Sequence, residues 1–180
     1  MSDTYYWDAN IFLSYVNGMP DRVPIIDDYF SRARRGECQI FTSTWSITEV
    51  AFETSEKGKR ILSQDIEKKI DSLWADRSVI KLIEVSPYLQ REARRLMRDG
   101  IPKGWSLKPV DAVHLASAVS DMVKGSEFHT YDNLKKYEAI TGLKIGPPNP
   151  PQGVLGLSAA ALTQQPQAAQ TAAPTGQIKT

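Results

Sequence analysis

Four acidic side chains occur in settings suited to metal chemistry. Asp8 follows the apolar stretch "TYYW", and Asn10 comes two residues later. Glu49 lies in "STWSITEV", Asp111 in "KPVDAVHLASA" and Asp132 in "FHTYDNL". Crowded carboxylates repel one another and their pKa values rise, a penalty that a hard divalent cation removes. Because oxygen ligands suit Mg²⁺ or Mn²⁺, the four acids are a candidate metal site.

Each acid taken alone also has an ordinary structural explanation. Asp8 and Asp132 could each cap a helix, Asp111 could complement a helix dipole, and Glu49 could be surface charge. The residues around Glu49 and Asp111 are apolar: Val50, Ala51, Phe52, Val110, Ala112, Val113 and Leu115. Acids set among apolar neighbours are costly unless something compensates them. Taken together, the four acids therefore favour a shared cation.

Strands and helices alternate along the chain. We expect strands at residues 4–7, 38–43, 79–85, 127–131 and 143–145, and helices at 11–16, 24–35, 44–57, 64–75, 86–100, 109–124 and 133–140. This order predicts an α/β fold of three layers, α/β/α, with helices on both faces of a mainly parallel sheet of four to five strands. Sites in such sheets form at the carboxyl ends of the strands. Asp8 and Asp132 are expected to end strands there, and Glu49 and Asp111 to lie in early turns of helices that start from the same edge.

The chain changes character at Pro147. Residues 147–180 hold six Pro, six Gln and seven Ala, with no acid and one Lys. Such a composition buries too little apolar surface to offset the entropy lost on ordering. We therefore expect one folded domain over residues 1–146 and a disordered Pro/Gln/Ala-rich tail over residues 147–180.

Composition excludes several other classes of protein. The net charge of +1 gives no global basic field, so any nucleic-acid surface must come from segregated charges. The single cysteine, Cys38, excludes an intramolecular disulfide and a cysteine-based zinc cluster. No apolar run is long enough to cross a bilayer, and the N-terminus has no basic stretch typical of a signal peptide. We expect a cytoplasmic protein without a membrane partner.

The order and local contexts of "DANIFL", "STWSITEV", "KPVDAVHLASA" and "FHTYD" resemble those of the PIN-domain ribonucleases. The likeness is closest to the VapC-like toxins of type II toxin–antitoxin pairs, and it covers about residues 4–146. It implies a PIN-like nuclease domain in which Asp8, Glu49, Asp111 and Asp132 are the catalytic metal ligands. Asn10 and Thr130 match positions that support the site in that family. The tail is not part of the family's core, and the connection "NGMPDRV" is more extended than the family's pattern.

The resemblance implies an endoribonuclease that cleaves single-stranded RNA with water activated by Mg²⁺ or Mn²⁺. It also implies a cognate antitoxin as partner, and we expect a homodimer. Two alternatives remain open. One is a PIN-like module that binds RNA or protein without cutting, although such a module need not keep four costly acids. The other is a phosphohydrolase with an aspartate nucleophile, although "DAN" lacks the second Asp usual in those enzymes.

Three further features have a possible role in binding RNA. An arginine stripe, which we define as Arg91, Arg94, Arg95 and Arg98, lies on one face of the helix expected at 86–100 and could follow RNA phosphates or simply face solvent. Trp105, in the loop before Asp111, could stack on a base, although such a residue more often anchors its loop. His114 lies one turn after Asp111, and we expect a hydrogen-bonded core histidine there rather than a substrate contact.

Overall fold

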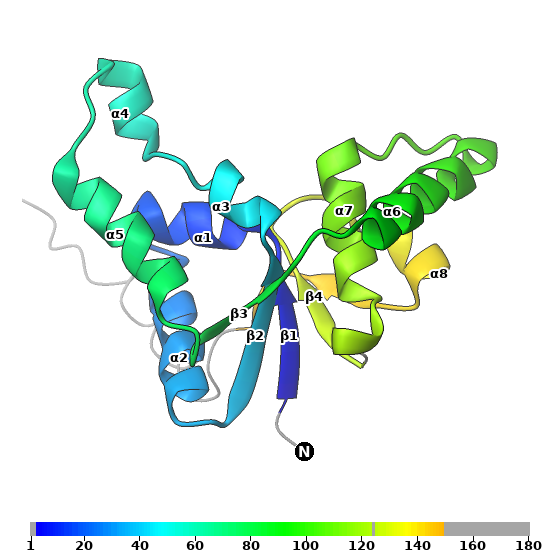
Figure 1. The fold of residues 1–180 in the computed structure, drawn as a ribbon, viewed down its shortest axis with the longest axis horizontal. Helices are drawn as coiled ribbons and strands as arrows, with labels where there is room; N and C mark the ends of the chain where they lie inside the picture. Colours follow the sequence, from blue (N-terminus) through cyan, green and yellow to red (C-terminus); the bar gives the residue numbers. More distant parts are fainter. Residues whose placement is uncertain (1–2, 124, 150–180) are drawn as a thin grey trace, which may run out of the picture. The chain divides into compact units, whose positions relative to one another are not determined.

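Five parallel strands form the centre of the domain. The structure is a computed structural model that describes residues 3–123 and 125–149. Its sheet has the order β3-β2-β1-β4-β5, and every neighbouring pair is parallel (Figure 1). The strands are β1 (Asp3–Trp7), β2 (Cys38–Ser43), β3 (Ile80–Ile83), β4 (Glu127–His129) and β5 (Lys144–Gly146). The predicted three-layer fold with a parallel sheet is confirmed.

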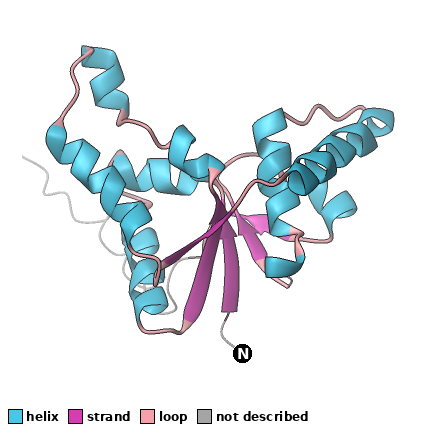
Figure 2. Ribbon diagram, viewed as in Figure 1, coloured by secondary structure: helices cyan, strands magenta, loops and turns pink. Residues whose placement is uncertain are grey.

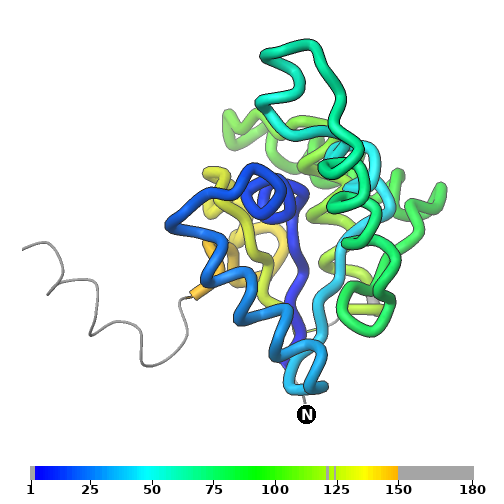
Figure 3. The backbone as a smooth tube through the Cα atoms, turned by 90° about the vertical axis from the view of Figure 1, so that its left-hand side faces the viewer, coloured from blue at the N-terminus to red at the C-terminus, as the bar shows by residue number. Residues whose placement is uncertain are grey.

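Helices cover both faces of this sheet (Figure 2). One face packs against α1 (Ala9–Val16), α2 (Val23–Arg34) and α5 (Gln64–Ala75), and the other against α6 (Pro87–Gly100), α7 (Pro109–Ala118) and α8 (Glu138–Thr141). Two short helices, α3 (Trp45–Glu49) and α4 (Thr54–Lys59), and the 3-10 turns η1 (Ile101–Lys103), η2 (Asp121–Val123) and η3 (Lys135–Tyr137) complete the described elements. In both views α4 and the segment after it extend away from the sheet (Figures 1 and 3).

The aromatic run of β1 supplies both layers of the core. Side chains of a strand alternate between the two faces of the sheet. Tyr5 and Trp7 accordingly belong to the apolar cluster under α1, α2 and α5, and Tyr6 belongs to the cluster under α6 and α7. All three are buried, so β1 is held from both sides and fixes the position of the residue that follows it.

The register of the sheet brings distant polar residues together at one edge. Trp7, the last residue of β1, pairs with His129, the last residue of β4. The Asp8 N–H then donates to the His129 carbonyl over 3.1 Å. Asp8 and Thr130 therefore leave the sheet side by side, at the carboxyl edge where a site was predicted.

The helix predicted at 44–57 is wrong as one element. Helix α3 ends at Glu49, and α4 begins only at Thr54. Val50 is fully buried, and its backbone leaves the helical region (φ −91°, ψ 59°). The chain then restarts a helix where the Glu53 N–H donates to the Glu56 carboxylate over 2.9 Å, a capping interaction. Packing of one apolar side chain thus overrides a continuous helical pattern.

Asp132 does not end a strand as predicted. Strand β4 stops at His129, and Asp132 lies three residues further on. The Thr130 hydroxyl accepts the Asp132 N–H over 3.0 Å, which turns the backbone away from the sheet. The predicted helix at 109–124 is also too long, because α7 ends at Ala118.

The contacts between residues divide the chain after Asn149, close to the predicted domain end at 146. Of the predicted tail, residues 150–180 lie outside the described residues. Among residues 3–123 and 125–149, no helix combines the length and the apolar character needed to span a membrane.

Candidate metal site

Asp8 is the most enclosed of the four acids. Asp8 follows β1, and the residue as a whole is only 4% exposed. The Asn10 amide donates to Oδ2 over 3.0 Å, and the Thr130 hydroxyl donates to the same oxygen over 2.9 Å. Burial raises the pKa of Asp8, and the nearby charges of Glu49 and Asp132 raise it further, against the opposing effects of His114 and Thr130. An ionised Asp8 is therefore costly here without a cation.

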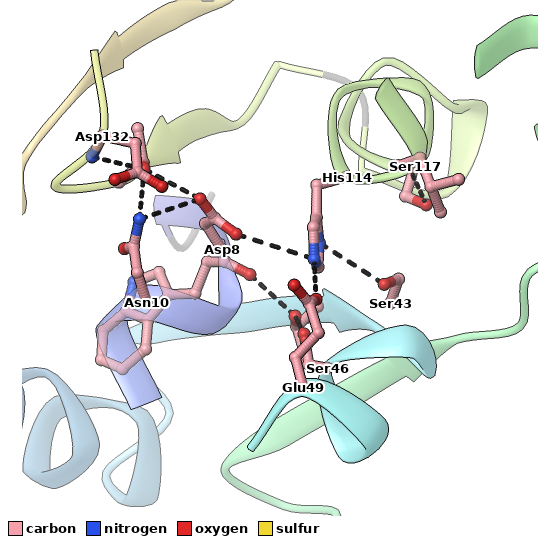
Figure 4. A network of polar contacts seen from close by, with 12 residues as sticks. Asp8, Asn10, Ser43, Ser46, Glu49, His114, Ser117 and Asp132 are labelled. Atoms are coloured by element: carbon pink, nitrogen blue, oxygen red, sulfur yellow. Dashed lines mark hydrogen bonds and ion pairs between the residues drawn. The ribbon is translucent and has the colours of Figure 1, made fainter. Parts of the chain in front are cut away.

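Asn10 and Thr130 tie the strand ends to one another. The Asn10 side-chain N–H also donates to the Thr130 hydroxyl over 2.8 Å, and the side-chain oxygen Oδ1 of Asn10 accepts the Tyr131 N–H over 3.2 Å. Thr130 in turn accepts the backbone N–H of Asp132. These contacts place the backbone of Asp132 beside Asp8, with Asn10 next to both (Figure 4). The supporting roles of Asn10 and Thr130 stay predictions.

Glu49 reaches the same region from α3. Its Oε2 lies 2.6 Å from Nε2 of His114, and that nitrogen lies 3.6 Å from Oδ1 of Asp8. Figure 4 shows contacts from both acids, Asp8 and Glu49, to the imidazole of His114. Of the apolar neighbours expected around Glu49, only Val50 is buried, whereas Ala51 and Phe52 are exposed. The acid is thus held by His114 rather than wedged into an apolar face.

Asp111 lies in the first turn of α7 and is partly buried. Burial raises the pKa of its carboxyl; Lys108 lowers it, and Asp132 and Glu49 raise it. Glu49 and Asp132 likewise raise the pKa of the Asp8 carboxyl. The four acids predicted from the sequence are therefore close enough to act on one another's charge.

Two of the ordinary explanations for these acids are wrong. Asp8 occupies the position before α1, but its side chain makes no capping hydrogen bond to that helix. Asp132 precedes η3, whose N-cap is Leu134. The first-turn position of Asp111 remains compatible with a dipole contact.

The donor set matches a hard divalent cation in its chemistry. It consists of carboxylates at the sheet edge with amide and hydroxyl oxygens around them, as Mg²⁺ or Mn²⁺ prefers. Within the part of the chain that the structure describes, however, no three Asp, Glu, His or Cys side chains converge closely enough to hold a metal ion. A cation would need the carboxylates to draw together.

The predicted RNA-binding residues lie on the other side of the sheet from α1. All four side chains of the arginine stripe are exposed on α6, which packs along α7. Arg95 is engaged by Glu92 at 2.9 Å and Asp99 at 2.8 Å. Trp105 packs edge-on against Tyr137, with ring centroids 5.5 Å apart, so it anchors its loop to the core. RNA contacts by these residues remain predictions.

A pocket of about 270 Å³ opens beside the acids. It combines a carboxylate with a cationic side chain, and its lining is Thr130, Tyr131, Asp132, Lys135, Ile145, Gly146 and Pro147. Another pocket, of about 320 Å³, lies between α3 and α5 and contains none of the four acids. Charge and proximity make the pocket at Asp132 the better candidate for a substrate phosphate.

The sequence did not indicate that Tyr6 and Ser43 belong to this network. The Tyr6 hydroxyl lies 2.9 Å from Nδ1 of His114 and accepts the Ser43 N–H over 3.0 Å. Side chains alternate between the two faces along β1, and Tyr6 lies on the face covered by α7. The strand pattern could therefore have predicted a contact between Tyr6 and α7. The partner on α7 could not be read from the sequence.

Comparison with solved structures decides the fold. The chain matches a chain of VapBC2 from Rickettsia felis, solved with a DNA fragment from its promoter, at a TM-score of 0.55 and 18% identity. The match covers 79% of this chain and 96% of that one. The fold is PIN-like. Similar matches are VapBC from Salmonella typhimurium bound to DNA (TM-score 0.55, 18% identity, 81% and 97% covered) and FitAcB from Neisseria gonorrhoeae (0.54, 15%, 80% and 97%).

At these identities the likeness concerns the PIN-like fold alone. A scan of protein-family models gives no match, and a search of curated proteins gives no similar sequence. What the site does must therefore be argued from its own residues.

Proposed function

We propose that this PIN-like protein is a Mg²⁺- or Mn²⁺-dependent endoribonuclease that cleaves single-stranded RNA. The observation that carries the proposal is the buried Asp8, whose pKa is raised by burial and by its neighbours Glu49 and Asp132. Clusters of acids with perturbed pKa values are typical of functional sites. A bound cation would offset the repulsion between these acids.

The roles of the residues follow from their environments. Asp8, Glu49, Asp111 and Asp132 would hold the cation, with Asn10 and Thr130 fixing the orientation of Asp8 through its Oδ2. Bound there, the metal would lower the pKa of a water and neutralise charge on the scissile phosphate. Lys135, on the pocket beside Asp132, is suited to a neighbouring phosphate. A serine or cysteine nucleophile is not required.

A partner protein is part of the proposal. The solved chains that this fold matches come from VapBC and FitAcB complexes, and we propose an antitoxin as partner, with this chain as a cytoplasmic toxin that also forms a homodimer. Large apolar side chains are exposed on α3 and on the connections before and after α4: Trp45, Ile47, Phe52, Ile61 and Leu62. Exposed apolar patches of this kind mark protein interfaces. Light scattering of the protein alone would test the homodimer.

The function is tested by cleavage of a single-stranded RNA in Mg²⁺ by the full-length protein. Changing Asp8, Asp111 or Asp132 to Asn, or Glu49 to Gln, should each remove most activity. Residues that act as one unit are not additive, so a double variant should be little worse than a single one. Asp71→Asn, an exposed acid on α5, is the matched control and should cleave as wild type does. Full activity in the four amide variants would contradict the proposal.

The same assay separates the alternatives. A PIN-like module that only binds RNA would retain the RNA without cutting it. An aspartate-nucleophile phosphohydrolase would depend on Asp8 and release phosphate from small esters rather than cut a chain internally.

A further inference from the structure

His114 connects the acids to the core. Its ring lies on α7 and is completely buried. Nε2 contacts Glu49 at 2.6 Å, and Nδ1 contacts the Tyr6 hydroxyl at 2.9 Å. Both ring nitrogens are thus used within the protein, and neither faces solvent.

The far side of the imidazole is held through residues of three strands. The Ser43 N–H on β2 donates to the Tyr6 hydroxyl on β1 over 3.0 Å. The Tyr6 ring stacks on Phe128 of β4, with centroids 5.3 Å apart and planes at 12°. Because the Tyr6 hydroxyl accepts from Ser43, its own proton can be donated to Nδ1, and in that tautomer the Nε2–H donates to Glu49. The ring is therefore held in one orientation by three strands.

Glu49 needs such a support more than Asp8 does. It is the last residue of a five-residue helix, and Val50 after it has left the helical conformation. Its side chain is 26% exposed, against 6% for Asp8. Within residues 3–123 and 125–149, His114 is its only hydrogen-bond partner, through Oε2. Without that contact the carboxylate would be free to sample other rotamers at the edge of the site.

We infer that His114 is a positioning residue that holds Glu49 in the metal site. The inference rests on the proposed function. His114 orients Oε2 of Glu49 and leaves Oε1 for the cation. The same nitrogen, Nε2, lies 3.6 Å from Oδ1 of Asp8, so one edge of the imidazole faces both acids. A partner that fixes a ligating carboxylate in this way typically contributes 10- to 100-fold to metal affinity, by the general rule for outer contacts of metal ligands.

Mn²⁺ affinity of the full-length protein, measured by EPR or calorimetry, is the test. His114→Leu should weaken Mn²⁺ binding by about 10- to 100-fold. His114→Gln, which keeps an N–H that can reach Glu49, should recover part of the loss. Tyr6→Phe should weaken binding to a smaller extent, because it releases only the far side of the ring. Ser117→Ala removes a buried hydroxyl of α7 that bonds the Val113 carbonyl, and it should leave Mn²⁺ affinity unchanged.

A double-variant cycle shows whether His114 acts through Glu49. If it does, His114→Leu should cost no further Mn²⁺ affinity once Glu49→Gln is present. Additive losses would overturn the inference, as would wild-type affinity in His114→Leu. Should His114→Leu fail to fold, Tyr6→Phe decides, and unchanged binding there overturns the inference. Wild-type protein that binds no Mn²⁺ would refute the proposed function and this inference together, whereas a failed cycle with normal wild-type binding refutes this inference alone.

Discussion

Asp8 carries a stability signature that separates a metal ligand from a simple polar residue. Its pKa is raised in the folded state, so the ionised form at neutral pH favours unfolding. Asp8→Asn should therefore stabilise the metal-free protein by about 1 kcal/mol, or roughly 3 °C in melting temperature. Thermal melting in chelator at pH 7 measures this change.

The same pair of proteins should respond differently to Mg²⁺. Wild type should melt higher as Mg²⁺ is added, because a ligand of the folded state stabilises it, and Asp8→Asn should gain less. Equal melting without metal and equal gains with it would mean that Asp8 holds no cation.

His129 gives the fold a distinct pH dependence. The Trp7 indole N–H donates to Nδ1 of His129 over 3.1 Å, a bond that protonation of Nδ1 would break. Burial lowers the pKa of His129 to about 4, against the opposing effect of Glu127. Below the unfolded value of 6.5 the unfolded chain takes up a proton that the folded chain refuses, so stability falls as the pH falls from 6.5 towards 4.

The comparison with His129→Gln isolates this effect, since the amide oxygen can still accept from Trp7 but does not titrate. Between pH 7 and pH 5, wild type should lose about 2 kcal/mol of unfolding free energy relative to the variant. Urea unfolding at the two pH values measures the difference. Parallel pH profiles for the two proteins would show that His129 titrates normally.

At the scale of elements, the arginine stripe on α6 is a test of RNA binding that is independent of catalysis. Arg91 and Arg94 are exposed, and Arg95 is engaged by Glu92 and Asp99. If the stripe follows phosphates, Arg91→Gln with Arg94→Gln should reduce the slope of log affinity against log salt by about 1.4, from roughly 0.7 for each contact to a single strand.

A second double variant that removes two positive charges elsewhere controls for the change in the net charge of the protein. Lys68→Gln with Arg77→Gln alters exposed cations outside α6 and should leave the slope unchanged. Binding to a short RNA, measured by fluorescence anisotropy at several salt concentrations, compares the two pairs. The stripe faces only solvent if both pairs keep the wild-type slope.

Element types could be predicted from the sequence where the pattern was long and its end signals were local. The helix expected at 86–100 is α6, with the Ser86 hydroxyl accepting the Leu89 N–H as its N-cap. The break after Glu49 could not be predicted, because it depends on burying Val50 against distant residues. The end of β4 before Asp132 likewise depends on the Thr130 hydroxyl, a local turn contact hidden by a strand-like sequence.

For the site, spacing along the chain identified acids that the fold does bring within electrostatic range of one another. Parallel strands deliver their carboxyl ends to one edge, so the positions of Asp8 and Thr130 followed from the strand pattern. The link from Glu49 through His114 to Tyr6 did not, because it joins residues more than 60 positions apart through side chains alone.

At the scale of the whole molecule, the PIN-like domain should be independent of residues 150–180. Contacts divide the chain after Asn149, and the composition beyond it is poor in large apolar residues. A protein ending at Asn149 should melt within about 1 °C of the full chain, a shift too small to reflect a lost core contact, and cleave RNA at the same rate. A protein ending at Gly146 also loses the buried Pro148 and should be less stable. A large drop in melting temperature for the protein ending at Asn149 would show that residues 150–180 pack on the domain.

Metal-dependent RNA cleavage is tested most directly by measuring the cleavage rate as a function of free Mn²⁺. The full-length protein and one single-stranded RNA are titrated from excess EDTA to millimolar Mn²⁺, with Asp132→Asn measured in parallel. We expect no cleavage in EDTA, a rate that rises and saturates with Mn²⁺ for wild type, and little cleavage by Asp132→Asn at any Mn²⁺ concentration. Cleavage in EDTA at the rate reached in Mn²⁺ would contradict this expectation.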